Sequence, residues 1–557
     1  MELCFIWVDG YRGFSNKSLN LSNKLHFEFN KDDNILTISK KRPIPQEICE
    51  NINSITALLG VNGSGKTRAL QLICEILEGE IHNYYQFLLI YENEGKVFAF
   101  SNIEISILNK SNITKFNQIE RSNSIYNRES LGVIFFSNVL DGGDRPVNGN
   151  IINTSLAHQV WGGYTDNHSL QESSNQSQLQ RHSRFLTEFH SKLNTPLPSK
   201  AIFILDSPAI LKKNSTNESI EKMFSICGDI FKGIPFLNIF KKASAHDKGK
   251  DEVLELFNEI AISFILKNMP ELIAVNCPYY NKHVIEDSGY KARTNINTLE
   301  KLIIYLIYII KEYCSKLRPD KRIIILNDLE FLKDDLLNTL IDGDLKVVSK
   351  SFLQTSFTIK VKNENLLSRI YKLSHIIDSS FGASKSNWLG ISSGERAYLN
   401  LLSSIWYGIK NTKSRDKSTL LICIDEGDLY LHPQWQIEFV DKVISFLRTT
   451  TQQPVQLIFT THSPLLVTDL PKQCITLLDD NRKVSSFGAN IYDIYETTFG
   501  LEEKRTGTIS QRYIERILNL SKQTEITESE RDEIECAIDI IDDELITFHL
   551  EKRLKIL

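Results

Sequence analysis

The sequence lacks the paired cysteines, the secretory leader and the strong net charge that would place it in a special class of protein. Its nine cysteines are scattered, and no two of them form a Cys-x-x-Cys pair, so we expect reduced, packed thiols. The first residues show no charged and then apolar leader, which predicts a cytoplasmic location. The net charge of −5, from 64 basic and 69 acidic residues, gives no global attraction to nucleic acid.

Long apolar runs are also missing. The most apolar run, residues 302–310, is bracketed by Lys301 and Lys311 and is far shorter than the roughly 20 residues that cross a bilayer. We therefore expect a buried helix there and no membrane partner. Helical patterns dominate residues 218–317, but no heptad is sustained over several repeats, so a long coiled-coil arm is not indicated.

The chain is long enough for more than one domain. Its 557 residues are 41% hydrophobic and 24% charged, as in ordinary soluble proteins. Strand and helix patterns typical of an α/β domain occur early, pause near residue 144, and resume with an apolar run at 356–361. We predict an α/β head in two parts, residues 1–143 and 356–490, separated by a compact and mainly helical insertion at 144–355. A polar segment at 164–183 inside the insertion is expected to be mobile. Residues 491–557 are expected to form a helical region that docks a partner.

A glycine-rich loop follows the first buried apolar run of the head. Residues 60–67 read Gly-Val-Asn-Gly-Ser-Gly-Lys-Thr, between the apolar run at 54–59 and an amphipathic helical pattern. In this context the motif predicts a phosphate site, because backbone N–H groups and a helix N-terminus attract anions. Lys66 is expected to neutralise the β- and γ-phosphates and the Thr67 hydroxyl to bind Mg²⁺. The predicted cradle of ATP consists of Gly60, Asn62, Gly63, Ser64 and Gly65.

An acidic pair ends a second apolar run. Residues 420–424 read Leu-Leu-Ile-Cys-Ile and lead into Asp425 and Glu426, and ligands bind at the carboxyl ends of strands in open α/β sheets. Asp425 is expected to hold Mg²⁺, and Glu426 to accept a proton from the water that attacks the γ-phosphate. Taken alone, such a pair is also compatible with a solvated acidic turn, so the glycine loop decides the interpretation.

Two further segments complete the pattern. Ile-Ser-Ser-Gly-Glu at 391–395 precedes an amphipathic helix, and a serine hydroxyl at a helix N-terminus suits a γ-phosphate, although the same letters form an ordinary helix cap. Since the glycine loop already surrounds the phosphates from one side, Ser392, Ser393 and Gly394 are expected to come from a facing second subunit. Thr-Thr-His-Ser-Pro ends the apolar run at 457–459 and places His462 where it could donate a hydrogen bond to phosphate.

These four elements, in this order, resemble the ABC-type ATPase superfamily, particularly its SMC, RecF and OLD-like branch. The resemblance implies a head with a mixed sheet and flanking helices that closes on a second head, forming a homodimer. It makes Ser392 and Gly394 part of the signature motif acting in trans, Glu426 the catalytic base and His462 the switch histidine. Ser393 departs from the usual Leu-Ser-Gly-Gly-Glu.

Two other segments look like parts of that branch. Tyr-Arg-Gly-Phe at 11–14 is similar to the early segment beside the nucleotide, which makes Arg12 an expected nucleotide contact. Residues 429–433 are similar to the segment after the acidic pair. Ser137 and Asn138 occupy the place of the family's glutamine loop.

The head, the insertion and the short tail together most resemble the ATPases of Septu and related retron antiphage-defence systems. That resemblance implies ATP-dependent control of a separate HNH nuclease, with a reverse transcriptase and its RNA-linked DNA as further partners in retron versions. Two alternatives remain: a DNA clamp for repair or chromosome organisation, and a self-sufficient OLD-type nuclease. The stretch after His462 is too short for the nuclease domain that the last alternative needs.

Overall fold

The architecture is taken from a computed structural model. It describes residues 1–44, 52–61, 63–78, 84–104, 106–109, 116–119, 131–139, 151–157, 177–193, 197–206, 234–244, 251–276, 296–313, 319–351, 354–381, 386–413, 419–479, 482–501, 506–523 and 525–556. In these ranges no helix is both long and apolar enough to span a membrane. The cysteines they contain are free thiols, of which only Cys536 is exposed.

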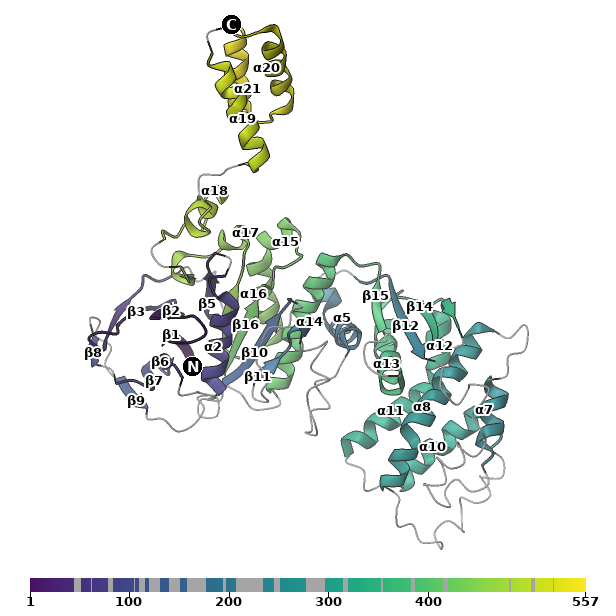
Figure 1. The fold of residues 1–557 in the computed structure, drawn as a ribbon. Coiled ribbons are helices and arrows are strands. Elements are labelled where there is room, and N and C mark those ends of the chain that lie inside the picture. The colour runs from purple at the N-terminus through teal and green to yellow at the C-terminus, as the bar shows by residue number, and fades with distance from the viewer. Residues whose placement is uncertain are drawn as a thin grey trace.

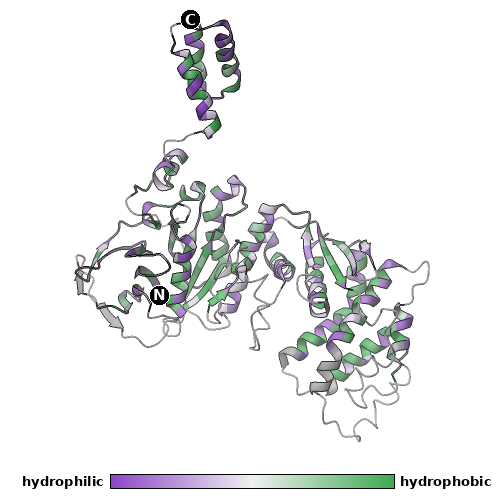
Figure 2. Ribbon diagram, in the orientation of Figure 1, coloured by the Kyte–Doolittle hydropathy of each residue, from purple (hydrophilic) through white to green (hydrophobic). Residues whose placement is uncertain are grey.

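A six-stranded parallel sheet forms the centre of the head (Figure 1). Its strand order is β11-β10-β16-β17-β5-β18, with bounds Ile151–Asn153, Leu131–Ser137, Thr419–Asp425, Val455–Thr460, Ile52–Leu59 and Ile475–Leu477. Every residue of β10, β16 and β17 is buried, as expected for parallel strands covered on both faces. Figure 2 shows these central strands as predominantly hydrophobic.

Helices cover the two faces of this sheet because alternate strand residues point in opposite directions. On one face, Val133 and Leu421 pack in a core with α2 (Lys66–Glu78). On the other, Ile134 and Ile422 share a core with α14 (Ser393–Lys413) and α16 (Phe439–Thr450).

A second sheet packs beyond α2 and makes the head mixed α/β. Its order is β2-β1-β6-β7-β9, with bounds Lys17–Asn20, Glu2–Asp9, Gln86–Asn93, Lys96–Ser101 and Phe116–Ile119. A small sheet of β3 (Leu25–Asn30), β4 (Ile35–Lys40) and β8 (Ser106–Asn109) adjoins it. Ile6 and Leu89 of the second sheet share one core with α2.

The region between the two parts of the head contains a sheet as well as helices. Its antiparallel order is β13-β14-β12-β15, with bounds Lys346–Lys350, Gln354–Lys360, Lys200–Asp206 and Ser386–Leu389. The helices of this region are α5 (Gln178–Leu193), α7 (Phe236–Ser244), α8 (Glu252–Asn276), α10 (Leu299–Tyr313), α11 (Pro319–Asp334), α12 (Leu336–Asp342) and α13 (Glu364–Phe381).

Both predicted boundaries of the insertion differ from the structure. β11 lies beyond residue 143 but pairs with β10 in the sheet of the head. β14, which was expected to resume the head at residue 356, pairs with β12 and β13 instead. An apolar strand pattern does not reveal which sheet the strand joins, because pairing is decided by the whole fold.

The C-terminal region is helical. It contains α18 (Ile491–Asp493), α19 (Thr508–Ser521), α20 (Glu528–Ile540) and α21 (Glu544–Leu554), whereas the short helices α15 (Pro433–Ile437) and α17 (Pro464–Val467) belong to the head. Helices α19, α20 and α21 pack around a core of their own that includes Ile517, Ile534, Ala537 and Leu550. Figure 1 shows this three-helix bundle set apart from the head.

Candidate functional site

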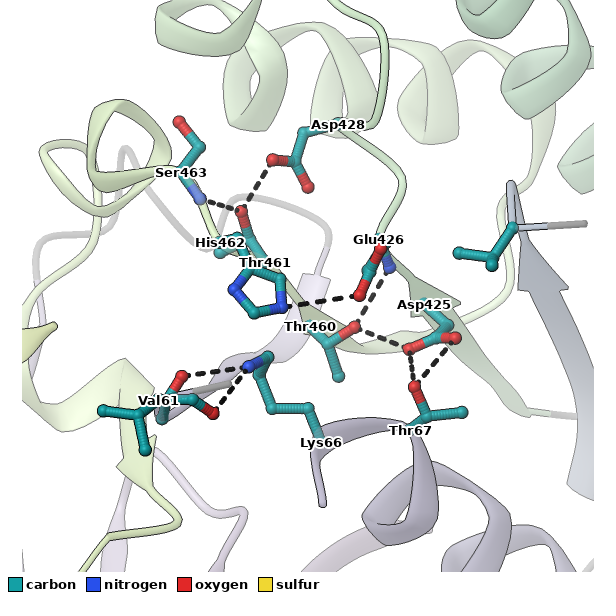
Figure 3. Close-up of polar contacts among 12 residues, drawn as sticks. Val61, Lys66, Thr67, Asp425, Glu426, Asp428, Thr460, Thr461, His462 and Ser463 are labelled. Carbon is teal, nitrogen blue, oxygen red and sulfur yellow. Dashed lines mark hydrogen bonds and ion pairs between the residues drawn. The ribbon is translucent and has the colours of Figure 1, made fainter. Parts of the chain in front are cut away.

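The carboxyl ends of β5, β16 and β17 meet at one edge of the parallel sheet, and each leads into a predicted motif. Residues 60–65 follow β5, Glu426 follows β16, and His462 lies two residues after β17. Parallel pairing makes this convergence unavoidable, because all carboxyl ends lie at the same edge. Figure 3 shows the resulting cluster of side chains.

The glycine loop is shaped by glycines in left-handed backbone conformations. Gly63 has φ +84° and Gly65 has φ +93°, a region that is costly for residues with a side chain. A Cβ on Gly65 would also lie 2.6 Å from Cε1 of Phe14, so this position allows no side chain on either ground. The Val61 N–H donates to Asp479 Oδ2 at 2.7 Å. Asn62, also predicted to bind ATP, lies outside the described residues.

Lys66 begins α2 and turns back over the loop. Its Nζ donates to the carbonyl oxygen of Gly60 at 2.9 Å and to that of Val61 at 3.3 Å (Figure 3). Burial lowers the pKa of Lys66, and the nearby carboxylates of Glu426 and Asp479 oppose this shift. An ammonium held by carbonyl oxygens is well placed to exchange them for phosphate oxygens.

Asp425 is fully buried at the end of β16 and accepts hydrogen bonds from three hydroxyl groups. Thr67 Oγ1 lies 3.0 Å and Thr460 Oγ1 2.8 Å from Asp425 Oδ1, and Ser137 Oγ lies 3.2 Å from Oδ2. A carboxylate surrounded by hydroxyls is a set of hard oxygen donors that suits Mg²⁺. The predicted metal pair, Thr67 and Asp425, is therefore brought together, and Ser137 joins it.

Glu426 and His462 face each other beside this cluster. His462 Nε2 lies 3.4 Å from Glu426 Oε1, and the two side chains are 42% and 27% exposed. The Glu426 backbone is left-handed, with φ 48°, and its N–H donates to Thr460 Oγ1 at 3.0 Å. Non-glycine residues in this conformation often mark functional sites. The two predicted catalytic side chains thus form a solvent-accessible acid–imidazole pair.

Asp428 contacts the loop after β17 that carries His462, which we call the histidine loop. Asp428 was not among the site residues predicted from the sequence. Its buried carboxylate accepts from Thr461 Oγ1 at 2.9 Å, and the same hydroxyl accepts from the Ser463 N–H at 2.9 Å. Burial raises the pKa of Asp428 to about 6, although the hydrogen bond from Thr461 opposes the shift. The sequence does show a third acidic residue two positions after Glu426, and this was the signal that could have identified Asp428 as part of the site.

The Ser-Ser-Gly segment lies at the N-terminus of α14. Ser392 Oγ accepts from the Glu395 N–H at 3.1 Å, and the Ser392 N–H donates to Glu395 Oε2 at 2.7 Å, which forms a capping box. Ser392 and Ser393 are exposed and take no part in the hydrogen bonds described above for Lys66, Thr67 and Asp425. A Cβ on Gly394 would lie 3.1 Å from the carbonyl oxygen of Tyr430, so this turn packs against the segment after the acidic pair.

Arg12 lies beside α2. Its guanidinium is 3.1 Å from Glu75 Oε1 and 5.4 Å from the centre of the Tyr11 ring, while its carbonyl oxygen accepts from Arg68 at 3.0 Å. The segment 11–14 therefore reaches the glycine loop mainly through Phe14.

Asn138, the other residue in the place of a glutamine loop, contacts helix α14. Its Oδ1 accepts from Asn400 Nδ2 of α14 at 3.2 Å. The neighbouring residues Ser137 and Asn138 thus contact Asp425 and α14 respectively.

Comparisons with known proteins identify ATPase features in this chain. Residues 390–467 match the family described as AAA ATPase domain. A stretch of 99 residues is 32% identical to the retron Ec83 probable ATPase of Escherichia coli, and it spans 17% of either chain.

Two solved structures of the recombination mediator protein RecF, described as RecF-ATP and RecF-ATPrS, are also similar. Each is 11% identical to this chain, with a TM-score of 0.21. The RecF-ATP match covers 83% of this chain and 93% of that structure, and the RecF-ATPrS match covers 85% and 96%.

The family match spans Ser392, Asp425, Glu426 and His462. The chain is therefore similar to an ATPase domain over the segment that holds three of the four predicted motifs.

Proposed function

We propose that the chain binds ATP with Mg²⁺ and hydrolyses it. The observation that carries the proposal is the meeting of Lys66, Thr67, Asp425, Glu426 and His462 at one edge of a parallel sheet (Figure 3). The match of residues 390–467 to an ATPase domain family supports the same activity.

Each group has a chemical role in this proposal. The N–H groups of the glycine loop and the N-terminus of α2 surround the phosphates, and Lys66 exchanges its carbonyl partners for phosphate oxygens. Thr67 and Asp425 would hold Mg²⁺, which when bound neutralises phosphate charge. The Glu426 carboxylate accepts the proton of the attacking water, and His462, 3.4 Å away, donates a hydrogen bond to the γ-phosphate.

The proposal includes two chains in each complete site. Ser392 and Ser393 are exposed at the start of α14, and within the described part of the glycine loop no hydrogen bond joins them to their own chain's loop. Closure of two heads in a homodimer would place them over the γ-phosphate held by the other chain, where serine hydroxyls and the helix N-terminus stabilise the anion.

The proposed biological role is ATP-dependent control of a separate HNH nuclease in antiphage defence, in an assembly that includes a reverse transcriptase and RNA-linked DNA where the system is a retron. The similarity to a retron ATPase supports this role. We expect the purified chain to hydrolyse ATP without cutting DNA, and cutting to require the nuclease. Mg²⁺-dependent cleavage by the isolated chain that survives Lys66→Ala would exclude this role.

The ATPase proposal is tested by two substitutions with opposite effects. Lys66→Ala is expected to remove most ATP affinity, because a site built around negative charge loses its cation. Glu426→Gln should bind ATP normally but hydrolyse it about 10² to 10⁴ times more slowly, since an amide accepts no proton. Binding is measured by equilibrium titration and hydrolysis by phosphate release. Lys96→Ala, at an exposed lysine of β7, is the matched control. A folded Lys66→Ala protein with unchanged ATP affinity would overturn the proposal.

A further inference from the structure

Helix α21 of the three-helix bundle carries apolar residues on two opposite faces. Leu550 and Leu554 are buried in the core of the bundle, and Ile546 packs against it. Leu545, Phe548 and Ile556 lie outside this core, with exposed fractions of 78%, 63% and 68%. One short region therefore exposes three large apolar side chains to water.

These three residues form one stripe rather than scattered exposures. Leu545, Phe548 and the exposed Lys552 follow intervals of three and four residues, which place side chains along one face of a helix. Ile556 lies in the turn just after the helix ends at Leu554. Single exposed apolar residues are common on protein surfaces, whereas a contiguous apolar strip bounded by charge marks an interaction site. The outer side of α21 and the turn after it group Leu545, Phe548 and Ile556 in this way, with Lys552 between the last two.

Charge is divided between the two ends of the same helix. Asp542, Asp543 and Glu544 are exposed at its N-terminal end, and Lys552 and Lys555 are exposed at its C-terminal end beside a single exposed acid, Glu551. The helix dipole favours this distribution within one chain, and Asp543 caps the helix by accepting from the N–H groups of Leu545 and Ile546. The dipole does not account for the exposed apolar stripe between the two ends.

We propose that α21 binds α21 of a second copy of the chain in an antiparallel pair. An antiparallel arrangement sets the acidic end of each helix against the basic end of the other, and the apolar stripes then meet between them. Such a contact is self-complementary, as a two-fold interface requires. It is separate from the head-to-head contact of the proposed function and needs no nucleotide.

The first test measures self-association of the full chain without nucleotide, by sedimentation equilibrium over a range of concentrations. Phe548→Ser is expected to weaken association at least about tenfold, because a central aromatic anchor is lost. Ile509→Ser is the matched control, since Ile509 is 78% exposed on α19 of the same bundle. The series is repeated in the Ser392→Arg background, which is expected to prevent closure of the heads, so that any remaining association comes from α21. Circular dichroism verifies that each variant folds.

The second test uses charge exchange. Glu544→Lys and Lys555→Glu are each expected to weaken association, whereas the double variant should restore it, because both contacts of the symmetric pair are inverted together. A chain that stays monomeric at all concentrations overturns the proposal. So does a double variant as weak as the single ones. If the chain is monomeric but a purified partner protein loses binding on Phe548→Ser, the stripe serves that partner and not a second copy.

Discussion

Gly65 occupies a tight position in the candidate site, in a left-handed turn against the ring of Phe14. Gly65→Ala is expected to lower ATP affinity by about tenfold or more, because it adds roughly 1–3 kcal/mol of backbone strain and a clash with the ring. Gly63→Ala is the matched control, since its φ is +84° but no atom lies within 4 Å of the added Cβ. Affinity is measured by equilibrium titration and stability by thermal unfolding.

Phe14→Ala in the Gly65→Ala background should recover affinity to the level of Gly63→Ala, because the clash disappears and the strain remains. Equal losses in Gly65→Ala and Gly63→Ala would show that the ring contact is unimportant.

Among individual residues, the sequence predicted the site residues that lie in local motifs. It did not predict the site residues that lie far from these motifs along the chain. Lys66, Thr67, Asp425, Glu426 and His462 meet in the structure, because each follows a strand at the same sheet edge. Their catalytic roles stay predictions. Asp479 could not be anticipated, since it contacts Val61 from 418 residues away and belongs to no motif.

Among the elements, the loops after β16 and β17 are locked to each other. Asp428 binds Thr461, while Ser463 Oγ donates to Gln436 Oε1 at 2.7 Å and Gln436 Nε2 donates to the Leu431 carbonyl at 3.0 Å. His462 lies inside this network and has little freedom of position. A change in the loop after β16 should therefore alter the histidine loop as well.

Asp428→Asn tests this lock through its pH dependence. Burial raises the pKa of Asp428 from 3.8 to about 6, so folding favours its protonated form. The favourable contribution is complete below pH 3.8 and is lost as pH rises through 6. Asparagine keeps the acceptor for Thr461 and carries no charge.

The variant should therefore gain stability relative to the parent between pH 5 and pH 7, by an amount on the order of 1–3 kcal/mol. Urea unfolding at both pH values measures the difference. Asp428→Ala, which removes the acceptor, should be less stable than Asp428→Asn at both. Parallel pH profiles for parent and Asp428→Asn would contradict the assignment.

At the scale of elements, the sequence patterns predicted strands but did not show the sheet of the insertion. β12 and β14 read as ordinary strands, and only their mutual pairing shows where they belong. The polar segment predicted to be mobile ends in α5, where Arg181 and His182 are buried. Arg181 donates to Asn400 Oδ1 of α14 at 2.8 Å. A partner on a distant helix allows Arg181 to be buried, and the segment itself gives no sign of that partner.

For the whole molecule, the decisive prediction concerns sites shared between chains. Lys66→Ala and Ser392→Arg should each be inactive alone. In an equal mixture, random pairing yields mixed dimers with one intact site, so activity should recover to about a quarter of the parent value. Steady-state phosphate release measures this recovery. Mixed dimers isolated with two different tags that remain inactive would show that each chain completes its own site.

The strand order of the central sheet also affects how the chain folds while it is being synthesised. β16 and β17 lie between β10 and β5, so the two long N-terminal strands never touch each other. β16 begins about 290 residues after β10, which at ribosomal rates corresponds to roughly 15 to 60 s of synthesis.

During this interval β5 has neither of its neighbours, because β17 and β18 both come later. An apolar strand without partners invites wrong pairing. The nascent N-terminal half should therefore depend on chaperones until β17 emerges, and its glycine loop should gain a phosphate-binding shape only then.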